Sequence, residues 1–366
     1  MTQVRSLCGS LALTLAVALT TAAQGATNFT QHNLTADTAG AADNTDPNLI
    51  GTWGISASPT SPFWVSNTTT GTSTLYNGIG VANATVVQVP TSANGGAKTG
   101  TPTGQVWSGY GVGNFEIAAG RNASFIFASL DGTISGFNGG GTPNIGRMVD
   151  NGAKGAVYTG LGIGISAAGP TLYAANFAAG TIDTFDKNYK PVLLSGSFLD
   201  PDLPAGFSPT NIQRFGRRMY VTYGQPDGNG GFVYGAGSGL VNVFDVNGNL
   251  LQRLIPASAH MNIPWGLAIA GANFGSFSYS LLVGNFGDGT ISAFDSETGN
   301  YLGTMQDGKG NNISIDGLWG LEFGSQGMGG NANGGDATAL FFAAAPSGGT
   351  HGLFGNLRPM ADSIIP

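Results

Sequence analysis

The chain has 366 residues, a formal net charge of −7 at pH 7 and only 9% charged residues. An acidic chain without a run of basic residues does not favour nucleic acid or an anionic membrane surface as a partner. Its 62 glycines would suggest disorder in a polar chain, but 41% of the residues are hydrophobic and 10% are aromatic, which is typical of a globular all-β protein with many tight turns.

The first 26 residues have the pattern of an export signal. Arg5 provides a positive start, residues 11–19 form a short apolar core, and small residues at 21–26 offer a cleavage site. This core is too short for a membrane anchor, and no later apolar stretch reaches 18 residues. The lone cysteine, Cys8, lies in the signal, so the processed chain has no disulfide. We therefore expect a secreted or periplasmic protein, cleaved near residues 23–26, with one domain over residues 27–366.

An aromatic residue followed by a turn residue ends a short strand-like run six times along the chain. The pairs are Tyr76-Asn77, Phe137-Asn138, Phe185-Asp186, Phe244-Asp245, Phe294-Asp295 and Phe354-Gly355. The aromatics are 61, 48, 59, 50 and 60 residues apart, and the copies at 175–186 and 284–295 align without a gap. A repeat of this length with several short strands predicts a six-bladed β-propeller.

Each repeat contains three recognisable strands. We expect inner strands, most of them with a glycine next to an aliphatic residue, at residues 53–55, 115–117, 163–165, 210–212, 265–267 and 319–321. Glycine suits a strand whose backbone approaches its neighbours closely near the axis. Second strands, rich in β-branched and aromatic residues, are expected at residues 63–65, 125–127, 172–174, 219–221, 281–283 and 340–342. Each third strand then ends on its aromatic residue.

Outer strands are less regular, with candidates at residues 86–90, 250–255 and 301–305. The sixth repeat runs out of chain after residues 354–359, whereas residues 29–35 form a strand-like segment before the first repeat. We predict that this segment joins the last blade and closes the ring, because an open sheet edge is prone to unwanted pairing. Longer insertions fall at residues 139–155, 188–208, 225–238 and 324–337, and the last two are rich in glycine and asparagine, as surface loops are.

Several acidic residues are expected to cap turns. Asp131-Gly132 and Asp288-Gly289 lie where hairpins need a positive φ. Residues 245–249 resemble the start of an EF-hand loop but lack its later glutamate, so a hairpin turn is the better interpretation.

Residues 173–186 resemble the propeller repeats of the YVTN and NHL types, and residues 262–268 resemble the inner strand of an NHL repeat. The whole chain after the signal resembles an uncharacterised family of exported bacterial six-bladed β-propeller proteins. The segments that carry this resemblance are residues 46–54, 200–204, 282–289, 315–320 and 351–355. The resemblance implies the propeller fold and an exported location, and it assigns no catalytic residue.

Propellers bind ligands at the mouth of the axial channel, where inner strands and the loops before them converge. The candidate residues there are Trp53, Glu116, Asn211, Asn262, Trp265, Asp316 and Trp319. Glu116, Asn211 and Asp316 offer the oxygen ligands that Ca²⁺ prefers. The competing interpretation is that the amides and carboxylates cap loops while the tryptophans pack between blades.

The sequence therefore predicts a binding scaffold for a small molecule, a protein or a cell-envelope component, with no cofactor evident apart from possible Ca²⁺. The alternative is a divalent-metal-dependent hydrolase of lactones or esters, because Glu, Asn and Asp residues at the axis are similar in type to those of gluconolactonase-like propellers, where a metal polarises the carbonyl. A purely structural envelope protein is a third possibility. His32, His260 and His351 fall in separate segments, and His260, which precedes an inner strand, is expected in a solvated loop.

Overall fold

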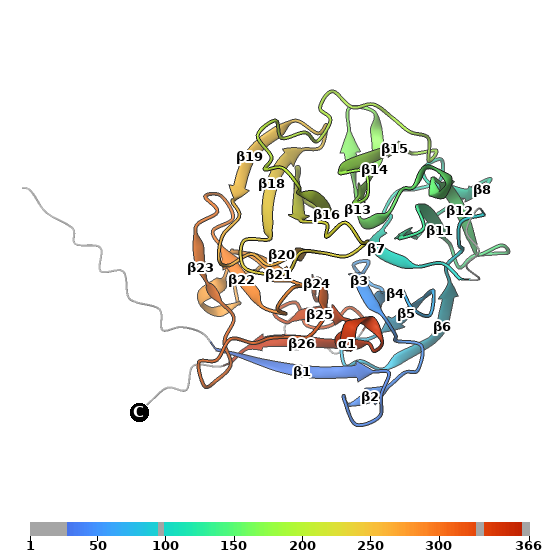
Figure 1. Cartoon of the computed structure of the whole chain (residues 1–366). Helices are drawn as coiled ribbons and strands as arrows, with labels where there is room; N and C mark the ends of the chain where they lie inside the picture. Colours follow the sequence, from blue (N-terminus) through green and yellow to red (C-terminus); the bar gives the residue numbers. More distant parts are fainter. Residues whose placement is uncertain (1–27, 94–98, 327–332, 361–366) are drawn as a thin grey trace, which may run out of the picture.

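Six small sheets surround one central axis, and the chain forms a six-bladed β-propeller (Figure 1). The structure is a computed structural model, and it describes residues 28–93, 99–326 and 333–360. The predicted all-β fold with six blades is confirmed. The predicted signal at residues 1–26 lies outside the described residues. No helix in those described ranges is long and apolar enough to cross a membrane.

The first three blades are formed in chain order. Blade one consists of β3 (Thr52–Ser56), β4 (Phe63–Asn67), β5 (Thr72–Tyr76) and β6 (Ala82–Gln88). Blade two consists of β7 (Pro102–Trp107), β10 (Phe125–Ser129), β11 (Thr133–Phe137) and β12 (Ile145–Asp150), with a small hairpin of β8 (Glu116–Ala118) and β9 (Arg121–Asn122) between β7 and β10. Blade three has β13 (Tyr158–Ser166), β14 (Gly169–Asn176) and β15 (Thr181–Asp186).

The last three blades follow the same order. Blade four consists of β16 (Ser208–Phe215), β17 (Arg218–Gly224), β18 (Gly239–Asp245) and β19 (Leu250–Ile255). Blade five consists of β20 (Pro264–Ile269), β21 (Leu281–Asn285), β22 (Ile291–Phe294) and β23 (Tyr301–Thr304). Blade six consists of β24 (Leu318–Phe323), β25 (Leu340–Ala344), β26 (Leu353–Pro359), β1 (Phe29–Ala36) and β2 (Asn44–Thr45). Single helical turns η1 (Gly152–Lys154), η2 (Gly275–Phe277) and α1 (Pro346–Gly349) lie in connections.

The inner strands β3, β7, β13, β16, β20 and β24 contact one another in sequence around the axis, and β24 returns to β3. Their glycines make this approach possible. A Cβ on Gly104 would lie 2.5 Å from the backbone nitrogen of Leu161, and a Cβ on Gly266 would lie 2.4 Å from the carbonyl oxygen of Trp319. Real Cβ atoms do not come this close to backbone atoms, so a larger residue would push neighbouring blades apart. The predicted reason for these glycines is confirmed.

One of the expected inner strands was misplaced. In blade two the inner strand is β7, whereas residues 115–117 lead into β8 in the added hairpin. Phe115 is fully buried because it packs against Tyr110 and Tyr189, so its apolar character reflects a side cluster away from the axis. In blade three the expected residues lie within β13, where Gly160 and Gly164 both approach blade four and Gly160 approaches it more closely.

The column of aromatic residues is confirmed in five blades and shifted in the sixth. In blade five, for example, Phe294 pairs with Leu281, the first residue of the second strand. In blade six the residue opposite the first residue of β25 is Leu357. Phe354 instead lies at the start of β26 and packs between blades six and one, against Phe63 and Phe341. The sixth repeat is therefore offset by three residues from the predicted alignment.

The chain's N-terminal strand closes the ring, as predicted. β1 pairs antiparallel with β26 from Phe29 opposite Pro359 to Ala36 opposite Leu353 (Figure 1). Phe29 is buried against Phe274 and Phe277 of blade five, with ring centroids 5.0 and 5.7 Å away. The start of the described chain is thus fixed by a full ladder and by packing on the next blade.

We expect Phe29→Ala to lower the free energy of unfolding by about 3 kcal/mol, because it leaves a cavity between blades five and six. Guanidinium unfolding followed by fluorescence measures this loss. Thr30→Ala, an exposed position on the same strand, is the control and should change stability by about 0.5 kcal/mol or less. A loss as small as the control's would mean that closure does not depend on this packing.

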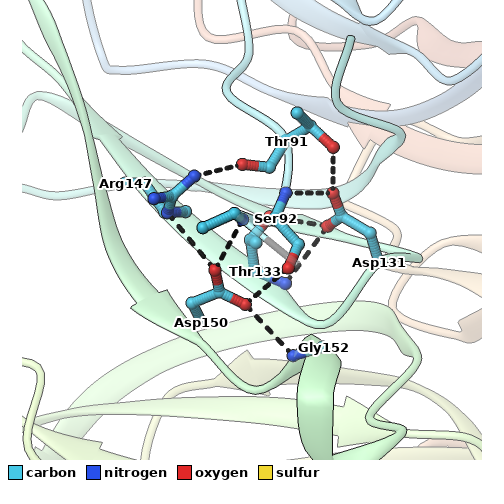
Figure 2. Close-up of polar contacts among 8 residues, drawn as sticks. Thr91, Ser92, Asp131, Thr133, Arg147, Asp150 and Gly152 are labelled. Carbon is cyan, nitrogen blue, oxygen red and sulfur yellow. Dashed lines mark hydrogen bonds and ion pairs between the residues drawn. The ribbon is translucent and has the colours of Figure 1, made fainter. Parts of the chain in front are cut away.

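Blades one and two are joined by a polar contact around two aspartates (Figure 2). Asp131 Oδ2 accepts hydrogen bonds from the Thr91 hydroxyl and the Ser92 amide, at 3.0 and 2.8 Å. Asp150 accepts from the Ser92 hydroxyl at 2.7 Å and from the Gly152 amide at 3.2 Å. These two carboxylates therefore hold the segment that leaves blade one against blade two.

The same Asp131 caps its own hairpin turn. Its Oδ1 atom accepts from the amide and the hydroxyl of Thr133, and Gly132 between them has a φ of 78°. Asp288 repeats this arrangement with Thr290. The predicted role of these aspartates in turns is confirmed. Asp245 likewise accepts from the amides of the two asparagines that follow it in a tight turn, at Asn247 and Asn249.

Although burial raises it, the pKa of Asp150 is held below its usual value by hydrogen bonds from the Ala93 amide, Ser92 and Gly152. A carboxylate with a lowered native pKa stabilises the fold above its unfolded pKa, and that contribution is lost as the pH falls through the native pKa. We expect Asp150→Asn to lower the free energy of unfolding by about 1 kcal/mol at pH 7 and by less below about pH 4. Urea unfolding over this pH range tests it, and a difference that stays constant with pH would contradict it.

Candidate functional site

Each inner strand carries a β-bulge near its start. There the inner strand has one more residue than the second strand that pairs with it. The extra residue interrupts the regular alternation of side chains along the strand and changes the direction of one of them. At the bulge, each inner strand has one position that is crowded against the next blade; it is glycine in five blades and Asn211 in blade four. The residue before this position is threonine in blades two, three and four and tryptophan in blades five, six and one. In ring order these residues are Thr103, Thr159, Thr210, Trp265, Trp319 and Trp53.

The three tryptophans form a cluster, here called the indole cluster, at the side of the ring where the inner strands begin. Trp53 and Trp319 stack with ring centroids 3.8 Å apart, and Trp265 meets Trp319 edge-on at 6.1 Å. Trp265 Nε1 donates a 3.0 Å hydrogen bond to the carbonyl of Thr159, two blades away. Phe286 stacks on the other side of Trp319 at 3.9 Å. Aromatic rings therefore fill the axis at this face, called the start face.

The opposite end of the axis is hollow. A cavity of about 340 Å³, here called the axial cavity, is lined by residues of all six inner strands and opens at the face where those strands end, the end face. Trp265 lies at its inner limit, so the indole cluster separates the cavity from the start face. Its polar lining residues include Ser56, Gln105, Asn211, Gln213, Arg214 and Glu322.

Two of these polar side chains are committed to joining blades. The amide nitrogen of Gln105 donates to the carbonyls of Gly54 and Trp64, at 2.9 and 2.7 Å. The amide nitrogen of Asn211 donates to the carbonyl of Trp265 at 2.9 Å. These amides hold the walls of the cavity in place.

Glu322 is the one acidic residue among the described residues that line the axial cavity. No described residue forms a hydrogen bond or an ion pair with its carboxyl group. The side chain is half-buried in the cavity wall, and desolvation by the surrounding protein raises the pKa of Glu322 to about 8. The carboxyl group is therefore mostly protonated at pH 7 and can donate a hydrogen bond into the cavity.

Arg214 lies at the mouth of the cavity and is fixed there by backbone carbonyls. Its Nε donates to Ile163 O at 2.9 Å and its Nη1 donates to Gly216 O at 2.7 Å. Its Nη2 has no hydrogen-bond partner within the described part of the chain, and it forms no ion pair with Glu322. A rigidly held guanidinium with a free donor is suited to binding an anionic or polar group.

Of the seven residues that the sequence nominated, the structure brings four together. Trp53, Trp265 and Trp319 form the indole cluster, and Asn211 bonds to the backbone of Trp265. They pack the axis, and Asn211 and Trp265 also line the cavity.

The other three lie in connections. The Asn262 side chain donates to Asp288 at 3.1 Å and accepts from the Gly235 amide at 3.0 Å. Asp316 accepts from the Ser347 amide at 2.8 Å. Glu116 belongs to β8, which packs on β11 and β12 at the rim of blade two (Figure 1). Its carboxylate accepts a hydrogen bond from the Gly113 amide.

Glu116, Asn211 and Asp316, nominated as metal ligands, are therefore not brought together. Glu116 is at the rim because residues 115–117 do not form an inner strand. No group of three His, Cys, Asp or Glu residues placed to hold a metal occurs in the described ranges. His32 and His351 instead pair with Asp43 and Asp37, each at 2.8 Å.

The insertions at residues 188–208 and 225–238 carry exposed apolar side chains. Leu193 and Leu199 are exposed in residues 188–208, and Val233 and Tyr234 are exposed in residues 225–238. The second insertion also brings Phe232 to the edge of the indole cluster, 6.1 Å from Trp319.

Sequence reasoning missed Glu322, although a signal was present. It is the only charged residue in β24, whose other side chains are apolar apart from a glycine. A charge in an otherwise apolar inner strand indicates a position that faces solvent or a ligand. The nominated residues came instead from the start of each strand, where the structure has packed indoles.

We expect Glu322→Gln to stabilise the protein, by on the order of 4 kcal/mol at pH 8. Because the native pKa is raised, the carboxyl of the unfolded state loses its proton at a lower pH than that of the folded state. The wild-type carboxyl therefore lowers the free energy of unfolding increasingly as the pH rises from about 4.5 to about 8. Above about pH 8 this cost stays constant. The gain in the variant should follow the same course in urea unfolding from pH 4 to pH 9. A gain that is equal at pH 4 and pH 8 would refute the burial of this carboxyl.

Comparisons with known proteins support the fold. No protein-family model matches the chain. A streptogramin B lyase structure aligns with a TM-score of 0.50 and 13% identity, over 91% of this chain and 98% of that one. A structural genomics protein of unknown function from Bacteroides thetaiotaomicron aligns with a TM-score of 0.50 and 12% identity, over 91% of this chain and 76% of that one. At these identities the likeness shows the propeller fold alone.

Two relatives come from Acanthamoeba polyphaga mimivirus. The uncharacterized protein R648 is 33% identical over 290 residues, which are 76% of this chain and 70% of that protein. The uncharacterized protein L690 is 31% identical over 332 residues, which are 87% of this chain and 82% of that protein. These relatives are viral, whereas the resemblance noted in the sequence pointed to bacterial proteins. The chain belongs to the protein family that includes R648 and L690.

Proposed function

We propose that this protein binds a small molecule in the axial cavity, through the mouth at the end face. The observation that carries the proposal is a cavity of about 340 Å³ that contains a carboxyl and a guanidinium, Glu322 and Arg214, with no bond between them. Enclosed polar groups in proteins are nearly always paired, so the unpaired carboxyl of Glu322, in a cavity that also has the free Nη2 donor of Arg214 at its mouth, indicates a place for a ligand.

Other features of the cavity support binding. Its walls are built on the six inner strands, the most tightly packed part of the ring, and are tied by the amides of Gln105 and Asn211. A rigid wall loses little conformational entropy when a ligand binds. The mouth is flanked by the exposed indole of Trp107, an amphipathic side chain of the kind enriched in binding sites.

The start face supports binding less well. There the indole cluster is packed, and Asn262 and Asp316 are engaged with neighbouring loops. The hydrolase alternative rests on Glu116, Asn211 and Asp316, which lie apart. Binding at the end face is therefore the function that the geometry supports best.

We further propose that the protein acts outside the cytoplasm, either secreted or periplasmic. The support is the pattern of residues 1–26, with a positive start, a short apolar core and small residues before the mature chain.

A fragment library screened by thermal shift tests the binding proposal. We expect hits that raise Tm, because a ligand that binds only the native state stabilises it. These shifts should disappear in Ala57→Trp, which fills the mouth of the axial cavity, and persist in Ala82→Trp, which adds the same ring at an exposed position of β6. Hits that are insensitive to Ala57→Trp, or no hits at all, would count against the proposal.

A further inference from the structure

We propose that the ligand of the axial cavity is a small organic acid with an apolar body, which enters body first and leaves its carboxylate between Arg214 and Glu322. This inference rests on the proposed function of the cavity and adds the chemical class of what it binds.

The first support is the layering of the cavity wall. When the inner strands are aligned on their crowded position, which is glycine in five blades and Asn211 in blade four, the next position holds apolar side chains in Ile55, Leu161 and Leu321. The two positions after that hold Gln213, Arg214 and Glu322, beside the apolar Val106, Trp107 and Ile163. Each residue of a strand adds about 3.3 Å, so this second layer lies roughly 3–7 Å closer to the mouth. The charged groups of the cavity therefore lie toward its opening, and its inner layer is apolar apart from the amides of Gln105 and Asn211.

The second support is the charge at the opening. Arg214 and Glu322 are the only charged residues among the described residues that line the axial cavity; β3, β7, β13 and β20 contribute none. Arg214 offers a full positive charge and a free Nη2 donor. Arg217 lines an adjoining hollow of about 480 Å³ that also shares Arg214, which adds positive charge at the same rim. The opening therefore attracts an anion more than a cation.

The third support is the state of Glu322. Because burial raises its pKa to about 8, the carboxyl carries a proton at pH 7 and adds no negative charge to the opening. A protonated carboxyl donates a strong, short hydrogen bond to a carboxylate, whereas it has less to offer an ammonium group. Arg214 and a neutral Glu322 are thus both hydrogen-bond donors in the lining of one cavity.

These features exclude simpler ligands of the same charge. A bare anion would leave the apolar layer of Ile55, Leu161 and Leu321 in contact with water. An amine would meet the Arg214 charge and would need Glu322 to ionise first. An acid with an aliphatic or aromatic body satisfies both layers at once, by burying apolar surface inside and pairing its carboxylate at the mouth.

Calorimetric titration with hexanoate tests the inference, with acetate, hexan-1-ol and hexylamine as probes that lack one part of the ligand. We expect hexanoate to bind at least tenfold more tightly than each of the three at pH 7. Its affinity should be constant from pH 6 to about pH 7.5 and fall about tenfold per pH unit above about pH 8, as Glu322 loses its proton.

Single substitutions distinguish the contributions of Arg214 and Glu322 to binding. Arg214→Gln should weaken hexanoate at least tenfold and leave hexan-1-ol unchanged, whereas Arg121→Gln, on the rim of blade two, should change neither. Glu322→Gln keeps a donor of the same shape, so hexanoate should still bind at pH 7 but without the fall above pH 8. The midpoint of thermal unfolding, measured without ligand, confirms that each variant is folded.

Each other outcome is decisive. Hexylamine binding more tightly than hexanoate, or an unchanged pH profile in Glu322→Gln, would overturn the acid assignment. If hexan-1-ol binds as well as hexanoate and Ala57→Trp blocks both, the cavity is a binding site and only the inferred ligand class is wrong. If none of the four probes binds, the acid is ruled out, and the fragment screen with Ala57→Trp decides separately whether the cavity binds anything.

Discussion

The structure depends on how closely six backbone strands can approach one axis. Glycines such as Gly104 and Gly266 let neighbouring inner strands touch backbone to backbone, at distances that no side chain allows. This crowding leaves no room for the preceding residue in the plane of the sheet, and a bulge in each inner strand turns that residue elsewhere. In three consecutive blades it is tryptophan, and the indoles fill the axis at the start face. The strands diverge beyond this point, and the axial cavity opens at the end face.

Contacts between neighbouring blades stabilise the ring in addition to the packing at its axis. β1 completes blade six, and Phe29 packs on blade five, so the first described strand joins two blades that are formed by the last part of the chain. Elsewhere, polar contacts connect blades. Asp150 joins blades one and two, and Trp265 reaches blade three from blade five. Of these contacts, that of Trp265 lies at the inner limit of the axial cavity, whose wall also carries Arg214 and Glu322.

Much of the fold was predictable from local patterns. The aromatic residue at the end of the third strand recurs because every blade needs the same packing, and the predicted outer strands at 250–255 and 301–305 match β19 and β23. The closing strand was predicted because a bare sheet edge is unfavourable. Blade two was misread because its inner strand, β7, is mostly polar and small, while the buried Phe115 belongs to a side cluster.

The candidate site was only partly predictable. Trp53, Trp265 and Trp319 were correctly placed at the axis, since a repeated Trp-Gly pair at the start of an inner strand is a local pattern. Glu322 was not recognised, because its importance comes from the five other strands that enclose it. The sequence by itself determined the repeat, the blade count and the strand that closes the ring, because these follow from patterns within each segment. Only the tertiary structure decided which end of the axis is filled and which is open, because that depends on side chains from all six blades meeting at one place.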